Sequence, residues 1–399
     1  MKILFISPYI PKECGIATYT HNLISSFDKT ASCSVVAIKD LFESKKFPKE
    51  VICEVAKNNI NEYKQSIKKI NNTNYSVVSL QHEFGLFGEK EGLNVLNFIN
   101  DIKKPIVVTY HTVLSQPNHL QKKIVTQMSS KASAIIVMAD EAKKRLKNIY
   151  GVAPQKIFKI PHGVPDISIG KSNQAKELLN LSGRKVVSVF GLLSRNKGIE
   201  FVIHAIPKII NEHPEIVFLL IGKTHPSILL TEGEEYRNYL IGQAEKLKII
   251  DNVRFINKFM THEEISRYLR ATDIYITPYL EKEQITSGTL SYALSAANPI
   301  ISTPYAYAKE LLRYKNGFLV PFRNSGAIAS KINKLFRDEE LRRQMAENSY
   351  AVARKMLWKN VARDHLVLFQ QVISNQTIDI HKKDPKSVKL YDFITIAEK

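Results

Sequence analysis

Short apolar segments alternate with longer amphipathic segments along the first part of the chain. The apolar segments are rich in Val, Ile and Leu, have the length of strands and span residues 2–7, 34–38, 76–80, 105–109, 134–138 and 156–160. The amphipathic segments 18–27, 121–130 and 140–150 have helical spacing, since Tyr19, Leu23 and Phe27, for example, recur every fourth residue. Continuous apolar strands separated by helices predict a parallel sheet with helices on both faces.

The same pattern then begins again. Strands are predicted over 185–190, 216–221, 253–256, 274–277, 299–302 and 317–320, and helices over 198–213, 235–247, 261–271, 290–297 and 327–340. Thr261 and Glu264 have the spacing of a helix capping box. Two successive units of this kind predict an α/β protein with two doubly wound, Rossmann-like domains that face each other across a cleft.

The boundary between the domains is predicted at 161–165, where two prolines and a glycine stiffen and redirect the chain. The first domain then spans 1–164 and the second 165–354. Residues 355–375 form a last amphipathic helix, which has Val361, His365, Leu368 and Val372 on one side. The remaining residues, 376–399, form a polar tail.

The 399 residues are 44% hydrophobic and 24% charged, which is typical of a globular protein and excludes a disordered or collagen-like chain. There are 57 Lys and Arg against 38 Asp and Glu, a formal net charge of +19. This excess favours anionic partners, namely phosphorylated ligands, an anionic membrane or nucleic acid. Nucleic acid is the least favoured of these, because the basic residues are not interleaved with aromatic ones.

The chain has three cysteines, Cys14, Cys33 and Cys53, which are too few and too scattered for a disulfide framework or a metal site. They indicate a reducing compartment. No apolar run approaches the roughly 18 residues of a membrane helix, and the first residues lack the apolar core of a secretory signal. We therefore expect a cytoplasmic protein, with peripheral attachment to a membrane as the alternative.

Ligands of doubly wound domains bind beyond the carboxyl ends of the strands, so we expect the binding residues in the loops after the strands. In loop 8–19, Gly15 precedes a helix whose first amides attract anions. In loop 190–198, Arg195 and Lys197 suit a diphosphate, because arginine supplies a fork and lysine a point charge. The structural alternatives are a tight turn and a solvated basic turn.

The loop 278–293 combines hydroxyls with exposed amides. Ser287, Gly288 and Thr289 form a second candidate anion nest, and the alternative is an ordinary capped helix start. Glu281, Glu283 and Gln284 are polar groups that could bind sugar hydroxyls. Lys223 and His225 lie in another loop on the second domain's side, and His82, Glu83 and His111 fall at the mouth of the first domain. For the histidines, a structural role in the core is the alternative.

Several of these segments together resemble a known family. They are Pro-Lys-Glu-Cys-Gly-Ile-Ala at 11–17, Tyr-His-Thr at 110–112, Ile-Pro-His-Gly-Val at 160–164, Gly-Leu-Leu-Ser-Arg-Asn-Lys-Gly at 191–198, and 271–305. In order and spacing the chain resembles, over about 1–375, the retaining glycosyltransferases of family 4, which have the GT-B fold. The resemblance implies a nucleotide-sugar donor on the second domain, an acceptor on the first, and a final helix that crosses back to the first domain.

The resemblance also assigns roles to residues. It places Gly15 and Ile16 near the diphosphate and sugar of the donor, His111 near the transferred sugar, and Lys197 at the diphosphate. Two departures are evident. The family's arginine after the glycine at 191 is Leu192 here, so Arg195 is a candidate substitute. The two glutamates of the family's Glu-x7-Glu pattern correspond to Gln284 and Tyr292, so Tyr292 offers the donor ribose a single hydroxyl.

A leaving nucleoside diphosphate must be neutralised by a metal ion or by fixed donors. The sequence contains no Asp-x-Asp. We therefore predict catalysis without a metal or another cofactor, in which Arg195, Lys197 and the amides of 287–289 compensate the charge. The sugar passes through an oxocarbenium-like state, as in glycoside hydrolysis.

The predicted function is transfer of a hexosyl group, with mannosyl as the first guess, to a sugar or lipid-linked glycan in polysaccharide or glycolipid synthesis. Basic stretches at 45–49, 64–69 and 143–147 favour contact with an anionic inner membrane face, and solvated surfaces are the alternative. Three other functions stay open. They are another GT-B enzyme (a phosphorylase or nucleotide-sugar epimerase), an inactive scaffold, which Leu192 and Tyr292 would suit, and nucleic-acid binding.

Overall fold

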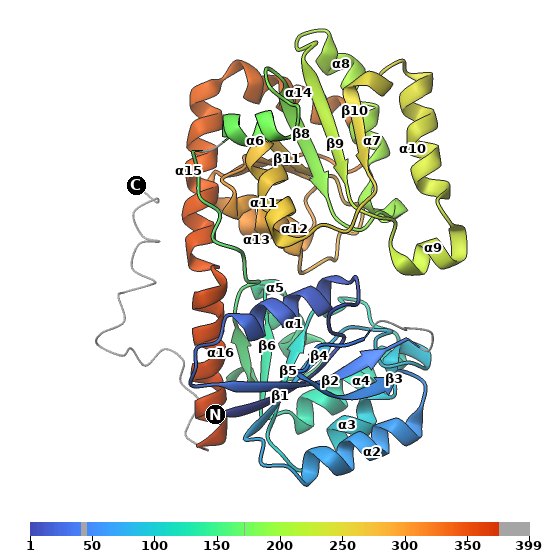
Figure 1. Ribbon diagram of the computed structural model, residues 1–399, viewed down its shortest axis with the longest axis vertical. Coiled ribbons are helices and arrows are strands. Elements are labelled where there is room, and N and C mark those ends of the chain that lie inside the picture. The colour runs from blue at the N-terminus through green and yellow to red at the C-terminus, as the bar shows by residue number, and fades with distance from the viewer. Residues whose placement is uncertain (41–45, 171, 375–399) are drawn as a thin grey trace, which may run out of the picture.

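The computed structural model describes residues 1–40, 46–170 and 172–374 and shows two domains, one above the other in Figure 1. The predicted tail at 376–399 and the first residue of the basic stretch 45–49 lie outside these residues. The first sheet is parallel, with the order β3-β2-β1-β4-β5-β6-β7. Its strands are β1 (Lys2–Ser7), β2 (Ser32–Lys39), β3 (Val51–Ala56), β4 (Val77–His82), β5 (Ile106–Tyr110), β6 (Ala134–Val137) and β7 (Ile157–Lys159).

The second sheet is also parallel, with the order β10-β9-β8-β11-β12-β13. Its strands are β8 (Lys185–Phe190), β9 (Ile216–Ile221), β10 (Val253–Ile256), β11 (Ile274–Thr277), β12 (Ile300–Ser302) and β13 (Gly317–Leu319). Every residue of β4 and β9 is buried, which explains the continuous apolar run of β9, whereas β4 also buries Ser79, Gln81 and His82. The doubly wound α/β fold predicted from the sequence is confirmed.

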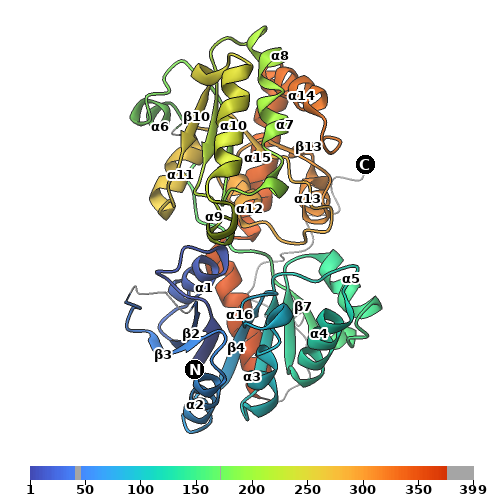
Figure 2. The same ribbon diagram turned by 90° about the vertical axis from the view of Figure 1, so that its right-hand side faces the viewer.

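Helices cover the sheets (Figures 1 and 2). Those of the first domain are α1 (Gly15–Ser25), α2 (Ile60–Asn71), α3 (Val95–Asp101), α4 (His119–Lys131) and α5 (Asp140–Asn148). Those that follow are α6 (Ser172–Leu178), α7 (Glu200–Ile203), α8 (Ile206–Ile210), α9 (Pro226–Glu232), α10 (Glu235–Lys246), α11 (His262–Ala271), α12 (Gly288–Ser295), α13 (Ala306–Leu311), α14 (Ser325–Arg337), α15 (Glu339–Lys355) and α16 (Trp358–Ile373).

The start of α11 confirms the predicted capping box. Thr261 Oγ1 accepts a hydrogen bond from the Glu264 N–H at 3.3 Å, and the Glu264 carboxylate accepts one from the Thr261 N–H at 2.9 Å. The single helix predicted over 198–213 is wrong, because the chain forms α7 and α8 instead. Pro207 has no N–H with which to continue the helical hydrogen bonds from α7.

The chain crosses between the domains twice, and the two crossings are hydrogen-bonded to each other. The Val164 N–H donates to the Met356 carbonyl at 2.8 Å, and the Trp358 N–H donates to the Val164 carbonyl at 3.0 Å. Gly163 packs against the indole, since a Cβ there would lie 2.1 Å from a ring carbon of Trp358. The first crossing therefore passes Gly163 and Val164 and is held against the second crossing.

The last helix, α16, returns to the first domain. Figures 1 and 2 show it running along that domain, where it contacts α1 and β4. Its buried side chains, among them Val361, Leu368 and Phe369, belong to the same core as Ile3 and Phe5 of β1. The crossing-back helix that the family resemblance implied is thus confirmed.

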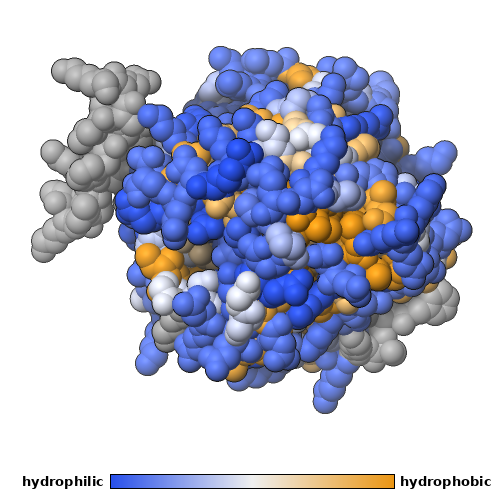
Figure 3. Space-filling model, turned by 90° about the horizontal axis from the view of Figure 1, so that it is seen from above, coloured by the Kyte–Doolittle hydropathy of each residue, from blue (hydrophilic) through white to orange (hydrophobic). Residues whose placement is uncertain are grey.

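The surface seen from above is largely hydrophilic and has several separate apolar patches, the largest of them right of centre (Figure 3). Within the described residues, no helix combines the length and the apolar character needed to span a membrane.

Candidate active site

The topology of the two sheets indicates which four loops are candidates for binding a ligand. The strand order reverses between β1 and β4 in the first sheet and between β8 and β11 in the second. Ligands of open parallel sheets bind at such switch points, beyond the carboxyl ends of the strands. The loops after these four strands begin at residues 8, 83, 191 and 278, and they contain most of the candidate residues; His111 follows β5 and Lys223 follows β9.

The loops of the second domain hold one another through backbone contacts. The Leu193 N–H donates to the Lys223 carbonyl at 2.7 Å, and the Leu280 N–H donates to the Asn196 carbonyl at 2.9 Å. Gly222, at φ +134°, fits only because it has no side chain, since a Cβ would lie 2.0 Å from the Gly191 carbonyl oxygen. The edge of this sheet is therefore a preformed backbone surface.

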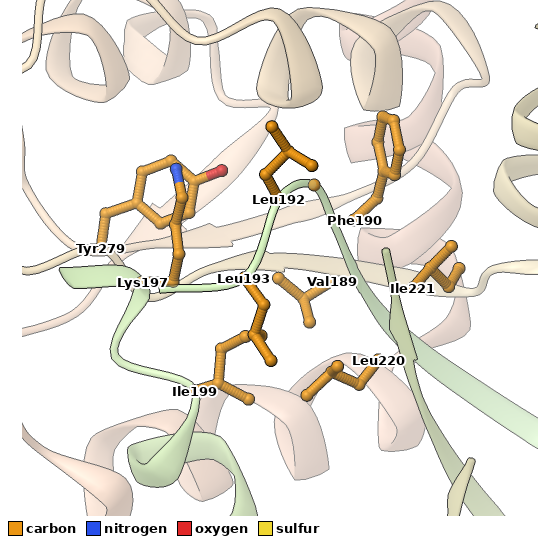
Figure 4. A pocket seen from close by; sticks show the side chains of 10 residues that line it. Val189, Phe190, Leu192, Leu193, Lys197, Ile199, Leu220, Ile221 and Tyr279 are labelled. Carbon is orange, nitrogen blue, oxygen red and sulfur yellow. The ribbon is translucent and has the colours of Figure 1, made fainter. Parts of the chain in front are cut away.

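Lys197 lines a small, partly open pocket at the ends of β8 and β9 (Figure 4). Its ammonium lies 3.8 Å from the centre of the Tyr279 ring, a cation–π contact that fixes the charge. The Tyr279 hydroxyl is hydrogen-bonded to Thr289 Oγ1 at 2.8 Å. Through Tyr279, the lysine and the start of α12 form one polar unit.

The start of α12 is capped by Ser287, whose Oγ accepts a hydrogen bond from the Leu290 N–H at 3.3 Å. Gly288 and Thr289 are the first two helical residues, and their N–H groups have no carbonyl partner within the helix. The structure thus places the predicted amide nest beside Tyr279 and Lys197.

Arg195 does not join this unit. Its guanidinium lies 3.3 Å from Glu232 and 3.5 Å from Glu235, and it stacks over Tyr236 at 5.5 Å. These partners belong to α9 and α10. The carboxylates of these two helices, rather than a ligand, balance the charge of Arg195 in this structure.

Glu283 contacts the first domain. Its carboxylate lies 2.8 Å from the guanidinium of Arg145, which is only 5% exposed. Arg145 also donates to the backbone carbonyls of Val113 at 2.9 Å and of Glu283 at 3.0 Å. Gln284 donates to the Thr286 carbonyl of its own loop at 2.7 Å. Both side chains that were expected to bind sugar hydroxyls hold the loop in place instead.

Tyr292 also joins the two domains. Its hydroxyl accepts a hydrogen bond from the Asn22 amide at 3.0 Å, and the Asn22 carbonyl oxygen accepts one from His262 Nε2 at 2.8 Å. The tyrosine is 5% exposed. The hydroxyl that was expected to bind the donor ribose therefore accepts a hydrogen bond from a residue of α1 instead.

At the junction between the domains, Lys223 of the second domain lies 2.8 Å from the Glu13 carboxylate of the first. Gly15 is the exposed first residue of α1, with open space where a Cβ would stand, and Ile16 follows it partly buried. The structure thus brings the start of α1 to the same junction as Lys223.

His111 lies in this junction and is 8% exposed. Its Nε2 is hydrogen-bonded to the Gln81 side-chain oxygen at 3.0 Å, and its ring meets Tyr19 edge to face at 5.0 Å. Burial, reinforced by the nearby His162 and His82, lowers its pKa to about 3. His111 is therefore neutral at physiological pH.

His82 was predicted to face an acceptor, but it is a core residue. Its ring is fully buried among Phe84, Phe87 and Tyr110, and neither nitrogen has a partner within the described part of the chain. Burial lowers its pKa to about 3. A neutral imidazole enclosed by aromatic rings does not contact a substrate.

Glu83, the next residue, is partly accessible. Its carboxylate accepts hydrogen bonds from Thr112 Oγ1 at 2.7 Å and from the Phe84 N–H at 2.9 Å. Burial raises its pKa to about 7 despite these two hydrogen bonds. Glu83 therefore exchanges a proton close to neutral pH.

His162 is the residue that sequence reasoning missed. It was quoted only as part of the segment 160–164, yet its ring meets Tyr19 at 5.3 Å and Tyr292 at 6.1 Å. The sequence feature that could have identified His162 as a candidate is its position in the first crossing between the domains. Among the residues that the structure describes, no three or more His, Cys, Asp or Glu side chains gather in a way that suits a metal ion.

Comparison with known families matches both domains. Residues 15–166 match the family described as Glycosyltransferase Family 4, and residues 171–352 match the family described as Glycosyl transferases group 1. Together the two matches cover both doubly wound domains.

Curated relatives are distant. Spore coat protein SA of Bacillus subtilis is 26% identical over 62% of this chain and 65% of its own length. Phosphatidyl-myo-inositol mannosyltransferase of Mycobacterium leprae is 22% identical over 68% of each chain, and D-inositol 3-phosphate glycosyltransferase of Corynebacterium glutamicum is 24% identical over 69% and 68%. The alignments thus span about two thirds of the length of these relatives.

Solved structures share the fold over nearly the whole chain. Sucrose-phosphate synthase from Thermosynechococcus elongatus has a TM-score of 0.77 at 17% identity, covering 94% of this chain and 100% of that one. Anabaena Alr3699/HepE in complex with UDP and glucose has a TM-score of 0.71 at 18% identity, covering 92% and 98%. At such identities the likeness concerns the fold.

Proposed function

Since the chain is a family 4-like glycosyltransferase with the GT-B fold, we propose that it transfers a hexosyl group from a nucleoside diphosphate sugar to a sugar or lipid-linked glycan. The proposal includes retention of the anomeric configuration and independence of a divalent metal. It also includes action at the cytoplasmic side of a membrane.

The position of Lys197 is the observation that carries this proposal. The lysine lies at the switch point of the second sheet, and Tyr279 connects it to the free amides at the start of α12. Negative charge builds on the diphosphate as the sugar leaves, and fixed cations and amides stabilise such charge where it develops. The site therefore has the donors that departure of a diphosphate requires.

The bond changes we propose balance without a further reactant. The bond between the anomeric carbon and the diphosphate oxygen breaks through an oxocarbenium-like state. The acceptor hydroxyl attacks from the same face, and its proton passes to the departing diphosphate oxygen. A glycosidic bond forms, and the nucleoside diphosphate leaves with the proton.

The comparisons support the substrate classes. Some curated relatives are mannosyl- or glycosyltransferases that act on inositol-containing acceptors by their names, and HepE was solved with UDP and glucose. A uridine nucleotide and a mannosyl or glucosyl group are therefore the first donors to test. The exposed lysines of α2 and α5, at 64–69 and 143–147, support an anionic membrane as the place of the acceptor.

Thermal shift measurements with nucleoside diphosphates and their sugars test the donor, because a ligand that binds the native state raises the melting temperature. We expect one nucleotide series to stabilise the protein and its sugar to be transferred or hydrolysed in the presence of EDTA. Loss of activity in EDTA that Mg²⁺ restores would contradict the metal-free mechanism. Nucleotide binding without turnover over a broad acceptor panel would indicate an inactive scaffold.

A further inference from the structure

His162 lies in the first crossing between the domains, with its ring enclosed by both. Its side chain is 8% exposed, and it meets Tyr19 at 5.3 Å and Trp358 at 5.8 Å. Nε2 faces the second domain, since a Cβ placed on Gly288 would lie 2.9 Å from it. The imidazole therefore lies directly against the first residue of α12.

The hydrogen bond of the other ring nitrogen fixes the tautomer. Nδ1 lies 2.7 Å from the Gly163 carbonyl oxygen, which can only accept, so Nδ1 carries the proton. Burial lowers the pKa of His162 to about 4, and the ring is neutral at physiological pH. Nε2 then presents a lone pair, for which the described residues supply no hydrogen-bond donor.

Donors and an acceptor thus stand together at the start of α12. The Gly288 and Thr289 amides are donors, and His162 Nε2 is an acceptor. A phosphate oxygen only accepts hydrogen bonds and would face the lone pair of Nε2. A sugar hydroxyl next to a diphosphate held by these amides can donate to the imidazole, which a phosphate oxygen cannot do.

Like His162, His111 has one ring nitrogen that is unprotonated and can accept a hydrogen bond. The Gln81 side-chain NH₂ donates to Ser79 Oγ at 3.2 Å, which leaves its oxygen to accept from His111 Nε2 at 3.0 Å. Nδ1 of the neutral His111 is therefore also an unprotonated acceptor. Both imidazoles meet the ring of Tyr19 edge to face, so they belong to one cluster at the junction.

We propose that His162 determines sugar specificity: its Nε2 accepts a hydrogen bond from one hydroxyl of the transferred sugar at the start of α12. This inference rests on the proposed function and extends it from the diphosphate to the sugar. Gly288 belongs to the same arrangement, because a side chain at this position would occupy the space of the imidazole.

Two variants distinguish the effect of losing the hydrogen-bond acceptor from the effect of losing the ring's volume. His162→Leu removes the acceptor, and His162→Gln keeps a neutral oxygen within similar reach. Calorimetry would measure the affinity of each variant for the nucleoside diphosphate, for the sugar donor found in the thermal shift screen, and for its monodeoxy analogues. His204→Leu, an exposed histidine bonded to Gln243, is the control.

We expect wild type to bind one deoxy analogue about tenfold more weakly than the full donor. His162→Leu should bind both equally and bind the nucleoside diphosphate as wild type does, while His162→Gln should keep part of the preference. A Leu variant with unchanged preference, or with a matching loss of nucleoside diphosphate affinity, would overturn the inference.

A measurement on the wild-type protein avoids dependence on the folding of the variants. We expect the ¹⁵N resonance of His162 Nε2 to shift towards that of a hydrogen-bonded nitrogen on addition of the sugar donor, and to stay unchanged with the nucleoside diphosphate. Donor binding without this shift would overturn the inference alone. Failure of wild type to bind any nucleotide sugar would overturn the proposed function and this inference with it.

Discussion

Lys197 and Tyr279 form a contact in which the ammonium lies 3.8 Å from the centre of the ring. Such a contact restricts a long side chain and keeps its charge at the mouth of the pocket. If this charge stabilises the leaving diphosphate, Lys197→Ala should lower turnover by about 100- to 1000-fold, measured as donor consumption. Lys331→Ala is the matched control, because Lys331 makes a similar contact with Phe318 outside the pocket. Equal rates in the two variants would remove Lys197 from the mechanism.

Glu83 gives a prediction about pH. Burial raises its pKa to about 7, above the ordinary value of a glutamate, so the folded protein holds a proton that the unfolded chain releases. The resulting stability is fully present below the unfolded pKa and is lost as pH rises to about 7. Relative to Glu83→Gln, wild type should lose about 1–3 kcal/mol between pH 4.5 and 8, measured by urea unfolding. A constant difference over this range would show that Glu83 titrates normally.

At the scale of elements, α5 of the first domain holds the loop after β11 of the second domain in place. Arg145 of α5 pairs with the Glu283 carboxylate and carbonyl, and Lys159, next to Asp140 of α5, lies 2.9 Å from Glu310 of α13. Arg145 is nearly fully buried, whereas Glu283 is half exposed, so truncating the arginine mainly leaves backbone carbonyls without a donor.

We therefore expect Arg145→Ala to lower the free energy of unfolding by about 1–3 kcal/mol and to raise the donor KM more than it lowers kcat. Denaturant unfolding and initial rates measure these effects. Arg343→Ala, which breaks exposed pairs within α15, should cost less than about 1 kcal/mol. An effect of similar size in both variants would mean that the interdomain pair does not position the loop.

The local sequence pattern predicted most of the helices and strands but fewer of the contacts that their side chains make. A buried strand such as β9 was evident because it is a continuous apolar run. The edge strand β3 was missed, because it is only partly buried and includes Glu54, so it lacks this pattern. The loops after the strands followed from the predicted order of strands and helices along the chain, but only the strand order of the sheets shows which of them lie at the switch points.

The site residues were harder to predict, because their partners come from distant elements. Arg195 is of a residue type that suits phosphate binding, but α9 and α10 place two carboxylates beside it. Tyr292 meets Asn22, which is 270 positions away in sequence. His162 was quoted for its place in a crossing, and only the packed structure shows what its ring faces. Spacing along the chain contains none of this information.

At the scale of the whole molecule, the two crossings determine how the domains are held. Gly163 lies against the indole of Trp358, and a Cβ would overlap the ring at 2.1 Å. Gly163→Ala should therefore destabilise the protein by at least about 2 kcal/mol, because the crossings must separate to admit the methyl group.

Calorimetric or denaturant unfolding measures this loss. Gly242→Ala is the matched control, because Gly242 lies inside α10 with open space where a Cβ would stand, and the change should stabilise the protein by about 0.5–1 kcal/mol. If Gly163→Ala were as stable as wild type, the crossings would tolerate separation.

The neighbouring crossings have a topological consequence. Because the backbones at Val164 and Leu357 are paired, the chain enters and leaves the second domain at nearly the same point. The protein is thus a seven-stranded domain, completed by α16, into which the second domain is inserted as a cassette. Cutting at these two positions would exchange one second domain for another while both junctions with the first domain keep their geometry.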